Sequence, residues 1–326
     1  MNTALILSFS FEQEQEAFEE LKKFGVMPLL LPADRREGWT EKELSEYWTG
    51  LVHKPEGILM GADIQLSEAF LSAAPELKYI SLNCAGYDHL DLEACRRHGI
   101  AVCNVSRRNY NAVADLAWGQ ILCLMRRIAL GDQKVRCGKW NEGVMRGSSV
   151  CQKTLGIVGL GAIGQAVAKR AAGFDMKLAA LSTSQKPELA EKYGLVYLEK
   201  DAFFSSCDII VLTCPAVKDT WHMVDEQALG WMKKDAFLIN PSRGALIDEK
   251  ALIKALQENR IAGAALDVFE EEPLLESPLF TMDNVLLTPH LGGLADREIH
   301  EVAMCSAINM GKMMRGEPVD LLQNLG

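Results

Sequence analysis

The segment Thr154-Leu-Gly-Ile-Val-Gly159-Leu-Gly161-Ala-Ile-Gly164 decides the fold class of this chain. An apolar run leads into three glycines spaced Gly-x-Gly-x-x-Gly, and residues 165–172 favour a helix. Between a strand and a helix, the first glycine permits a tight turn and the second lets the backbone approach a pyrophosphate. The third packs helix against strand, and the helix N-terminus faces the anion. The segment therefore predicts a dinucleotide site, with contacts from Gly159, Gly161, Ala162, Ile163 and Gly164.

Apolar runs alternate with helical patterns on both sides of this segment, which is typical of parallel βαβ units. Before it, strands are predicted at 4–9, 26–31, 57–60, 77–83 and 100–104. The later strands are predicted at 154–159, 177–181, 209–213, 237–240, 263–267 and 285–288, followed by a last helix at 298–314. The sequence thus predicts an α/β protein with two doubly wound domains.

Composition excludes several classes of protein. The 326 residues fit two domains, and 48% hydrophobic with 24% charged residues is ordinary for a globular chain. A net charge of −10 argues against a nucleic-acid partner, which requires a basic face. The nine cysteines show no metal-binding spacing, so we expect reduced thiols, no metal site and a cytoplasmic location. No stretch approaches the roughly 18 apolar residues of a membrane helix, so no membrane partner is expected.

Residues 112–128 predict one long helix that is apolar on most faces. A helix that is apolar nearly all round is buried. The sequence leaves open whether it lies between domains or between subunits.

The tip of the strand at 177–181 bears on the choice of cofactor. A NAD enzyme usually places an acid here to hold the ribose 2′-hydroxyl. This chain instead continues with Ser182, Thr183, Ser184, Gln185 and Lys186. Hydroxyls and a lysine favour a 2′-phosphate, so we expect NADP to be preferred. The alternative is an enzyme that accepts NAD and leaves Lys186 in solvent.

Three side chains at strand ends suggest catalysis of hydride transfer to a 2-oxo acid. Arg243 follows Asn240-Pro-Ser, where a guanidinium can hold a substrate carboxylate. Glu272 and His290 follow the strands ending at 267 and 288. A carboxylate beside an imidazole stabilises the imidazolium, which can then donate a proton. The remaining histidines are expected to lack such a setting and to be ordinary surface or packing residues: His53, His89, His98, His222 and His300.

Taken together, these motifs resemble those of the D-2-hydroxyacid dehydrogenase family. They are Gly159–Gly164, Asn240–Gly244, Asp267–Pro273 and Pro289–Gly293. The resemblance covers the whole chain. It implies a Rossmann cofactor domain at 104–293, inserted into a flavodoxin-like substrate domain made of 1–103 and 294–326, with the active site in the cleft.

The resemblance also implies roles for individual residues. Arg243 would anchor the substrate, His290 would be the acid/base and Glu272 its partner, while Asp267 would face the nicotinamide carboxamide. The substrate carboxylate would meet the loop of Cys84, Ala85 and Gly86. Further cofactor contacts would come from Thr213, Cys214, Pro215, Thr220, Asn240, Pro241, Ser242, Gly292 and Gly293. The family is usually dimeric through its cofactor domains, so a homodimer is expected.

This chain departs from the family pattern at two places that affect ligands. Cys84-Ala85 replaces the more usual Val-Gly, and the acid expected at 182 is absent. The leading interpretation is a reductase of small 2-oxo acids, such as glyoxylate or hydroxypyruvate, that uses NADPH or NADH. One alternative is a short phosphoglycerate dehydrogenase, with Arg107 and Arg108 binding a phosphate. Another is a non-catalytic dinucleotide sensor that acts as a co-regulator, as some relatives do.

Overall fold

The computed structural model describes residues 2–32, 38–62, 64–105, 108–141 and 146–322. The chain forms two compact units. Unit 1 comprises Met1–Asn109 and Gly293–Gly326, and unit 2 comprises Tyr110–Gly292.

Unit 1 is built on a five-stranded parallel sheet in the order β2-β1-β3-β4-β5. Its strands are β1 (Asn2–Leu7), β2 (Val26–Leu30), β3 (Gly57–Met60), β4 (Tyr79–Leu82) and β5 (Ala101–Cys103). Its helices are α1 (Phe9–Glu12), α2 (Gln15–Lys23), α3 (Glu41–Gly50), α4 (Glu68–Ala73), α5 (Leu92–Arg97) and α13 (Asp296–Arg315).

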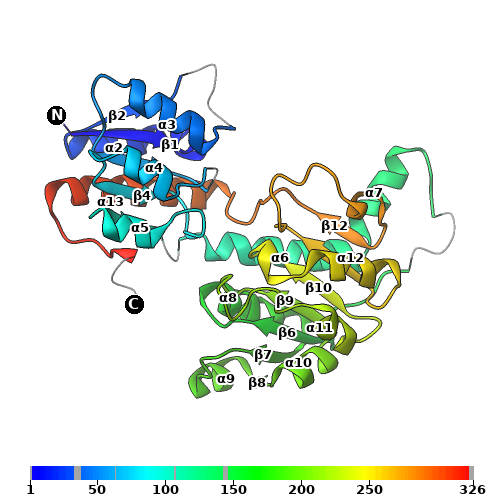
Figure 1. Cartoon of the computed structure of the whole chain (residues 1–326). Coiled ribbons are helices and arrows are strands. Elements are labelled where there is room, and N and C mark those ends of the chain that lie inside the picture. The colour runs from blue at the N-terminus through cyan, green and yellow to red at the C-terminus, as the bar shows by residue number, and fades with distance from the viewer. Residues whose placement is uncertain (1, 33–37, 63, 106–107, 142–145, 323–326) are drawn as a thin grey trace. The chain divides into compact units, whose positions relative to one another are not determined.

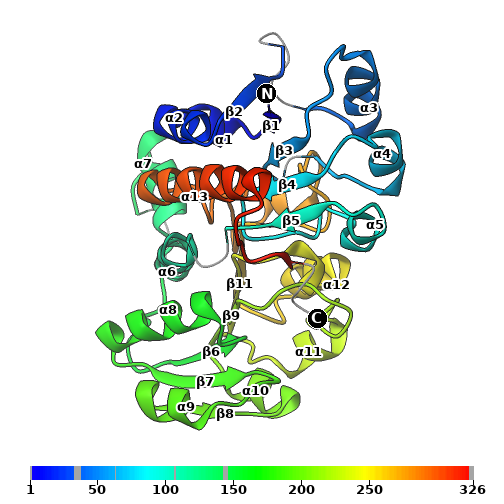
Figure 2. The ribbon, with the colours of Figure 1, turned by 90° about the vertical axis from the view of Figure 1, so that its left-hand side faces the viewer.

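The C-terminal helix α13 belongs to the first half of the fold rather than to its neighbours in sequence. It packs against α2 and β4, as Figure 2 shows. Gly311 makes this packing close, because a Cβ atom there would lie 2.2 Å from the ring of Phe24. Ala303, Ala307 and Met310 of α13 are fully buried in the same cluster. Burial of this apolar face therefore holds the C-terminal segment of the chain against the N-terminal segment and completes unit 1.

Unit 2 is built on a seven-stranded parallel sheet in the order β12-β11-β10-β9-β6-β7-β8 (Figure 1). Its strands are β6 (Thr154–Val158), β7 (Lys177–Leu181), β8 (Leu195–Tyr197), β9 (Ile209–Leu212), β10 (Phe237–Asn240), β11 (Gly263–Leu266) and β12 (Val285–Leu287). Its α-helices are α6 (Tyr110–Met125), α7 (Ile128–Arg136), α8 (Ala162–Ala171), α9 (Pro187–Tyr193), α10 (Lys200–Ser206), α11 (Glu226–Trp231) and α12 (Glu249–Gln257). Short 3-10 turns are η1 (Ala172–Phe174), η2 (Gly244–Leu246) and η3 (Pro278–Thr281).

The strand order in unit 2 reverses between β6 and β9. In open parallel sheets, ligands bind beyond the carboxyl ends of the strands at such a reversal. The glycine segment follows β6, and Thr213 follows β9. The predicted fold class, α/β with two doubly wound parallel sheets, is confirmed.

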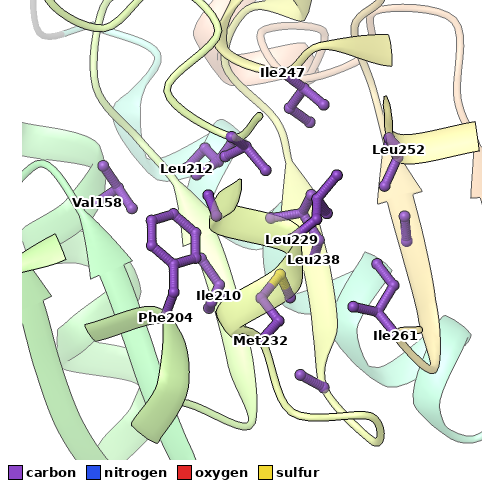
Figure 3. Close-up of a cluster of buried hydrophobic side chains, with 14 of the residues drawn as sticks. Val158, Phe204, Ile210, Leu212, Leu229, Met232, Leu238, Ile247, Leu252 and Ile261 are labelled. Carbon is purple, nitrogen blue, oxygen red and sulfur yellow. The ribbon is translucent and has the colours of Figure 1, made fainter. Parts of the chain in front are cut away.

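Two apolar clusters cover the two faces of the unit 2 sheet. One contains side chains of α10, α11 and α12, among them Phe204, Leu229 and Leu252 (Figure 3). The other contains side chains of α6 and α8, among them Trp118 and Val167. Burial on both faces holds the strand ends in fixed positions.

The helix predicted at 112–128 corresponds to α6, which ends at Met125, three residues earlier than predicted. Arg127 has φ of +56°, which ends α6 and starts α7 in a new direction. The apolar residues of α6 contribute to the core of unit 2 itself, which accounts for much of its apolar character. Helix α3 and strand β8 were not predicted. Within the described residues, no helix is long and apolar enough to cross a membrane.

Candidate active site

The glycine segment forms a cradle between β6 and α8. Gly159 has φ of +87°, and a Cβ atom there would lie 2.9 Å from the Cβ of Cys214. A Cβ at Gly164 would lie 2.1 Å from the carbonyl oxygen of Gly159. Gly161 is the N-cap of α8 and provides no side-chain cap, so the first N–H groups of the helix stay available to an anion. The cradle, which includes Ala162 and Ile163, has the shape and charge that a pyrophosphate requires.

Residues from the neighbouring strand ends complete this cradle. The Thr213 hydroxyl donates to the carbonyl oxygens of Val158 and Gly159, at 2.9 and 2.6 Å. The following turn is closed by Thr220, whose hydroxyl donates to the Pro215 carbonyl at 2.6 Å. Burial raises the pKa of the Cys214 thiol to about 11, so it stays protonated at neutral pH. Cys214 also lies close to the glycine turn, since its Cβ would be 2.9 Å from a Cβ on Gly159.

The segment after β7 exposes its polar groups. Ser182 donates to the Ser184 carbonyl at 3.2 Å, and Thr183, Ser184 and Lys186 are exposed. The backbone N–H of Lys186 donates to the Tyr197 hydroxyl at 3.0 Å, and that hydroxyl donates to the Lys186 carbonyl at 3.2 Å. This contact was not predicted, because Tyr197 lies on the unpredicted strand β8.

Arg243 follows a tight turn at the end of β10. The Asn240 side chain is fully buried; it donates to the Arg243 carbonyl at 2.8 Å and accepts from the Ser242 nitrogen at 3.1 Å. The Ser242 hydroxyl donates to the Cys214 carbonyl at 2.8 Å, and Pro241, between Asn240 and Ser242 in the chain, is buried. These bonds fix the backbone from which the guanidinium extends.

Asp267 organises the turn that carries His290. Its fully buried carboxylate accepts from the Thr288 hydroxyl at 2.6 Å and from the nitrogens of Leu291 and Gly292 at 2.8 Å each. Gln120 of α6 donates to Thr288 at 3.0 Å. His290 itself has φ of +53°, an uncommon conformation that this network holds in place. Sequence reasoning missed Gln120, because nothing in the pattern of α6 separates it from other polar residues. Gly293 begins the second segment of unit 1.

Glu272 and His290 form a hydrogen-bonded pair. Oε2 of Glu272 lies 2.8 Å from Nδ1 of His290, and Oε1 accepts from the Phe269 nitrogen at 3.0 Å. The carboxylate therefore assigns the hydrogen to Nδ1. Nε2 makes no hydrogen bond to the described residues and remains available for proton transfer.

The charges around this pair favour the imidazolium. The hydrogen bond to Glu272 raises the pKa of His290, against burial and the charge of Arg243, which both lower it. Burial acts to raise the pKa of Glu272, but His290, the Phe269 N–H and Arg243 together bring it below its usual value. Arg243 is thus close enough to both groups to act on their charge. The structure brings the three predicted catalytic residues together at one end of the unit 2 sheet.

The prediction that the other histidines lack a neighbouring carboxylate is wrong for three of them. His98 lies 2.7 Å from Glu68, His222 lies 2.7 Å from Glu270, and His300 lies 2.8 Å from Glu14. A carboxylate partner alone therefore does not distinguish His290. These partners are distant in sequence, so the local pattern around each histidine gave no signal.

The predicted substrate loop lies in unit 1. The Asn104 amide donates to the Ala85 carbonyl at 2.6 Å, and the Cys84 thiol donates to the Gly86 carbonyl at 3.2 Å. The N–H groups of Ala85 and Gly86 make no hydrogen bond to the described residues. Arg107 lies outside the described residues. No group of three or more potential metal ligands occurs in the part of the chain that the structure describes.

Residues 118–292 match the family model for the NAD binding domain of D-isomer specific 2-hydroxyacid dehydrogenases. The chain belongs to this family. A glyoxylate reductase of Thermococcus litoralis is 42% identical over 260 residues, 78% of each chain. One of Pyrococcus horikoshii is 40% identical over 292 residues, 87% of each chain. The crystal structure of a glyoxylate reductase from Paecilomyes thermophila is 29% identical, covers 100% of this chain and 99% of that chain, and has a TM-score of 0.86.

The family and the site agree on the class of chemistry. The chain is an NAD(P)-dependent 2-hydroxyacid dehydrogenase, similar to glyoxylate reductases at about 40% identity over most of its length. The residues matched by the model of the NAD binding domain, 118–292, all lie in unit 2.

Proposed function

We propose that this dehydrogenase reduces small 2-oxo acids of the glyoxylate and hydroxypyruvate class. The observation that carries the proposal is the Glu272–His290 pair, with Nδ1 engaged and Nε2 available, beside the charge of Arg243. The glyoxylate reductases among its relatives support the small substrate. The site residues have separate tasks in this proposal.

The proposed proton path begins at His290. A bound nicotinamide dinucleotide supplies the hydride. The imidazolium gives the Nε2 proton to the substrate oxygen, and the neutral imidazole takes a proton back at Nε2 in the oxidative direction. Glu272 compensates the charge of the ring through Nδ1, and Arg243 holds the substrate carboxylate and polarises the carbonyl. The N–H groups of Ala85 and Gly86 are proposed to receive the same carboxylate.

We propose that unit 2 holds the cofactor through its glycine cradle. The pyrophosphate would meet the N-terminus of α8, and residues 213–220, 240–242 and 292 would line the rest of the dinucleotide. Because Ser182 and Lys186 replace an acid, NADPH is the preferred partner, with NADH used less well. Asp267, whose carboxylate holds the 288–292 turn, is proposed to face the carboxamide. Gly293 is proposed to lie at the edge of this site, and unit 1 to bind the substrate.

We also propose a homodimer in the cytoplasm. Helix α7 buries no residue, and Ile128, Val135 and Trp140 are exposed on it and after it. A second copy of the chain would cover this apolar surface. The nine cysteines are free thiols, as a reducing compartment would keep them. Light scattering of Trp140→Ser should show a smaller mass than the wild type, while Leu275→Ser, an equally exposed control, should not.

A substrate panel tests the proposed activity. NADPH and NADH oxidation would be measured with glyoxylate, hydroxypyruvate, pyruvate, longer 2-oxo acids and phosphohydroxypyruvate. The proposal expects the highest kcat/KM with glyoxylate or hydroxypyruvate and NADPH. Preference for phosphohydroxypyruvate would replace it with a phosphoglycerate dehydrogenase, and binding of the dinucleotide without turnover would favour a sensor.

A further inference from the structure

The loop that follows β11 carries two glutamates that each face a histidine. Glu272 faces His290, as described above. Two residues earlier, Oε1 of Glu270 lies 2.7 Å from Nε2 of His222. That nitrogen is buried and is not aligned for a hydrogen bond, so the contact is an ion pair when His222 is protonated. The second pair has no place in the proton path, which raises the question of its purpose.

Glu270 is also tied to the start of α12. Its backbone N–H donates to the carboxylate of Glu249, and the N–H of Glu249 donates to the carboxylate of Glu270, both at 3.3 Å. Glu249 cannot shift easily, because Ile247 and Leu252 on either side of it are buried in the apolar cluster of Figure 3. The loop is therefore anchored to a rigid part of unit 2.

The third member of the cluster, His222, is anchored to the same segment. Its N–H donates to the Ala245 carbonyl at 2.8 Å, and Val224 donates to Leu246 at 3.0 Å. The Trp221 ring stacks on the imidazole with centroids 5.0 Å apart. Glu249, Glu270 and His222, here called the loop brace, thus join three segments of unit 2.

The loop brace lies next to the backbone that holds Glu272. Gly244, directly after Arg243, approaches Phe269 so closely that a Cβ on it would lie 1.9 Å from the Phe269 carbonyl carbon. The N–H of the same Phe269 donates to Glu272. A movement of Glu270 would therefore displace the neighbouring donor to Glu272 and the turn next to Arg243.

Charge explains why the loop brace includes a histidine. Burial raises the pKa of Glu249, and the nearby charge of Glu270 raises it further. Two adjacent carboxylates repel each other, and the ring of His222, which contacts Glu270 at 2.7 Å, offsets this repulsion when it carries a charge. The groups that act on His290 are Glu272, Arg243 and Asp267, and none of them belongs to the brace. Any influence of the brace on His290 would therefore pass through the backbone of the loop.

We propose that Glu270 is a positioning residue, held by His222 and Glu249, that fixes residues 269–272 and so keeps Glu272 in hydrogen-bonding geometry with His290. This inference rests on the proposed function for the roles of Glu272 and His290. It assigns Glu270 no contact with substrate or cofactor.

The test follows His290 directly. The titration of the His290 ring would be recorded by NMR on histidine-labelled protein, with the His290→Ala spectrum as assignment. In Glu270→Gln we expect the apparent pKa of His290 to fall. Above that pKa, kcat/KM of the variant should be lower than that of the wild type by roughly twofold to tenfold. This corresponds to the lower part of the range of interaction energies for residues coupled in one network. Glu271→Gln, an exposed neighbour in the same loop, is the matched control and should leave the titration unchanged.

A double-mutant cycle separates positioning from simple stabilisation. In a Glu272→Gln background, Glu270→Gln should have no further effect on the His290 titration. An unchanged His290 titration in Glu270→Gln together with a lower Tm would overturn the proposal. It would also be overturned if Glu270→Gln lowered the apparent pKa of His290 equally in the Glu272→Gln background, or if Glu271→Gln lowered it as much as Glu270→Gln does. If Glu270→Gln does not fold, His222→Asn gives the same readout, because asparagine tolerates the positive φ of +48° at this position.

The two proposals fail in different ways. The ring titration needs no turnover, so a falling pKa in an enzyme that reduces no 2-oxo acid would refute the proposed function and support the positioning role. An active enzyme with an unchanged titration in Glu270→Gln would refute the positioning role alone.

Discussion

Two histidine–glutamate pairs arise from one loop, and the two carboxylates engage different ring nitrogens of their histidines. Glu270 and Glu272 are two residues apart, and their partners are His222 and His290 at 2.7 and 2.8 Å. In the first pair the contact uses Nε2, and Trp221 stacks on the ring. In the second pair Nδ1 makes the contact and Nε2 remains available.

In the proposed function, the ring nitrogen that the carboxylate engages therefore matters more than the presence of a carboxylate partner. Both histidines have positive φ, at +48° and +53°, so backbone conformation does not separate them. What separates them is the surrounding structure. Arg243 acts on the charge of His290 and Glu272, whereas Glu249 adds a second carboxylate to the other pair. The setting of His290 fits the proposed proton transfer, and the setting of His222 fits the proposed positioning role of Glu270.

The largest expected effect comes from removing the proposed proton donor. His290→Ala should lower kcat by at least about 100-fold, because a positioned acid/base contributes roughly 10²–10⁴-fold. His300→Ala is a matched control, since it removes a histidine paired with Glu14 at 2.8 Å in unit 1. Steady-state rates with glyoxylate and NADPH measure both. Equal losses in the two variants would contradict the comparison.

The next effect tests the backbone that joins the two pairs. Gly244→Ala would place a Cβ within 1.9 Å of the Phe269 backbone, so both pairs should be displaced. We expect a loss of about 1–3 kcal/mol in the free energy of unfolding, as for other overpacked sites, together with a large loss of kcat. Gly230→Ala in α11, where the new Cβ meets open space, should be neutral or stabilising. Urea unfolding measures the free energy of unfolding of the two variants. A loss in Gly244→Ala alone would indicate local strain at the Phe269 backbone, whereas a loss in both would indicate that glycine-to-alanine changes are generally destabilising here.

The fold was largely predictable because its strands are buried on both faces. Strands β3, β7 and β10 have the predicted bounds, since each contains a continuous, buried apolar run. The misses are elements with little burial. Helix α3 buries only Leu44 and Trp48, and the edge strand β8 has three residues. Such elements leave a weak pattern in sequence.

The candidate site was predictable only in part, for a different reason. Arg243, Glu272 and His290 follow strand ends, and parallel strands bring their carboxyl ends to one edge. The partners of His98 and His300 are 30 and 286 residues away in the chain, so no local pattern reveals them. The same holds for Gln120 and Thr288, which are 168 residues apart.

A smaller effect should come from a change outside both pairs. Ser182→Asp places a carboxylate where a 2′-phosphate is proposed to bind, so the ratio of kcat/KM for NADPH over NADH should fall about tenfold or more, which corresponds to about 1.4 kcal/mol. Ser205→Asp, which adds the same charge on α10, is the control. The titration of His290 should be unchanged in both. An unaltered cofactor ratio in Ser182→Asp would show that the proposed NADP preference has another origin.

The most direct test of the central claim is the pH dependence of kcat/KM for 2-oxo acid reduction in the wild type and in Glu272→Gln. His290 must be protonated to act as the acid, and Glu272 raises its pKa above the ordinary value of 6.5. Activity should therefore be retained below that raised pKa and decline as pH rises through it. In Glu272→Gln the decline should begin at lower pH. The same decline in both proteins would contradict the account, because the carboxylate would then have no influence on the proton donor.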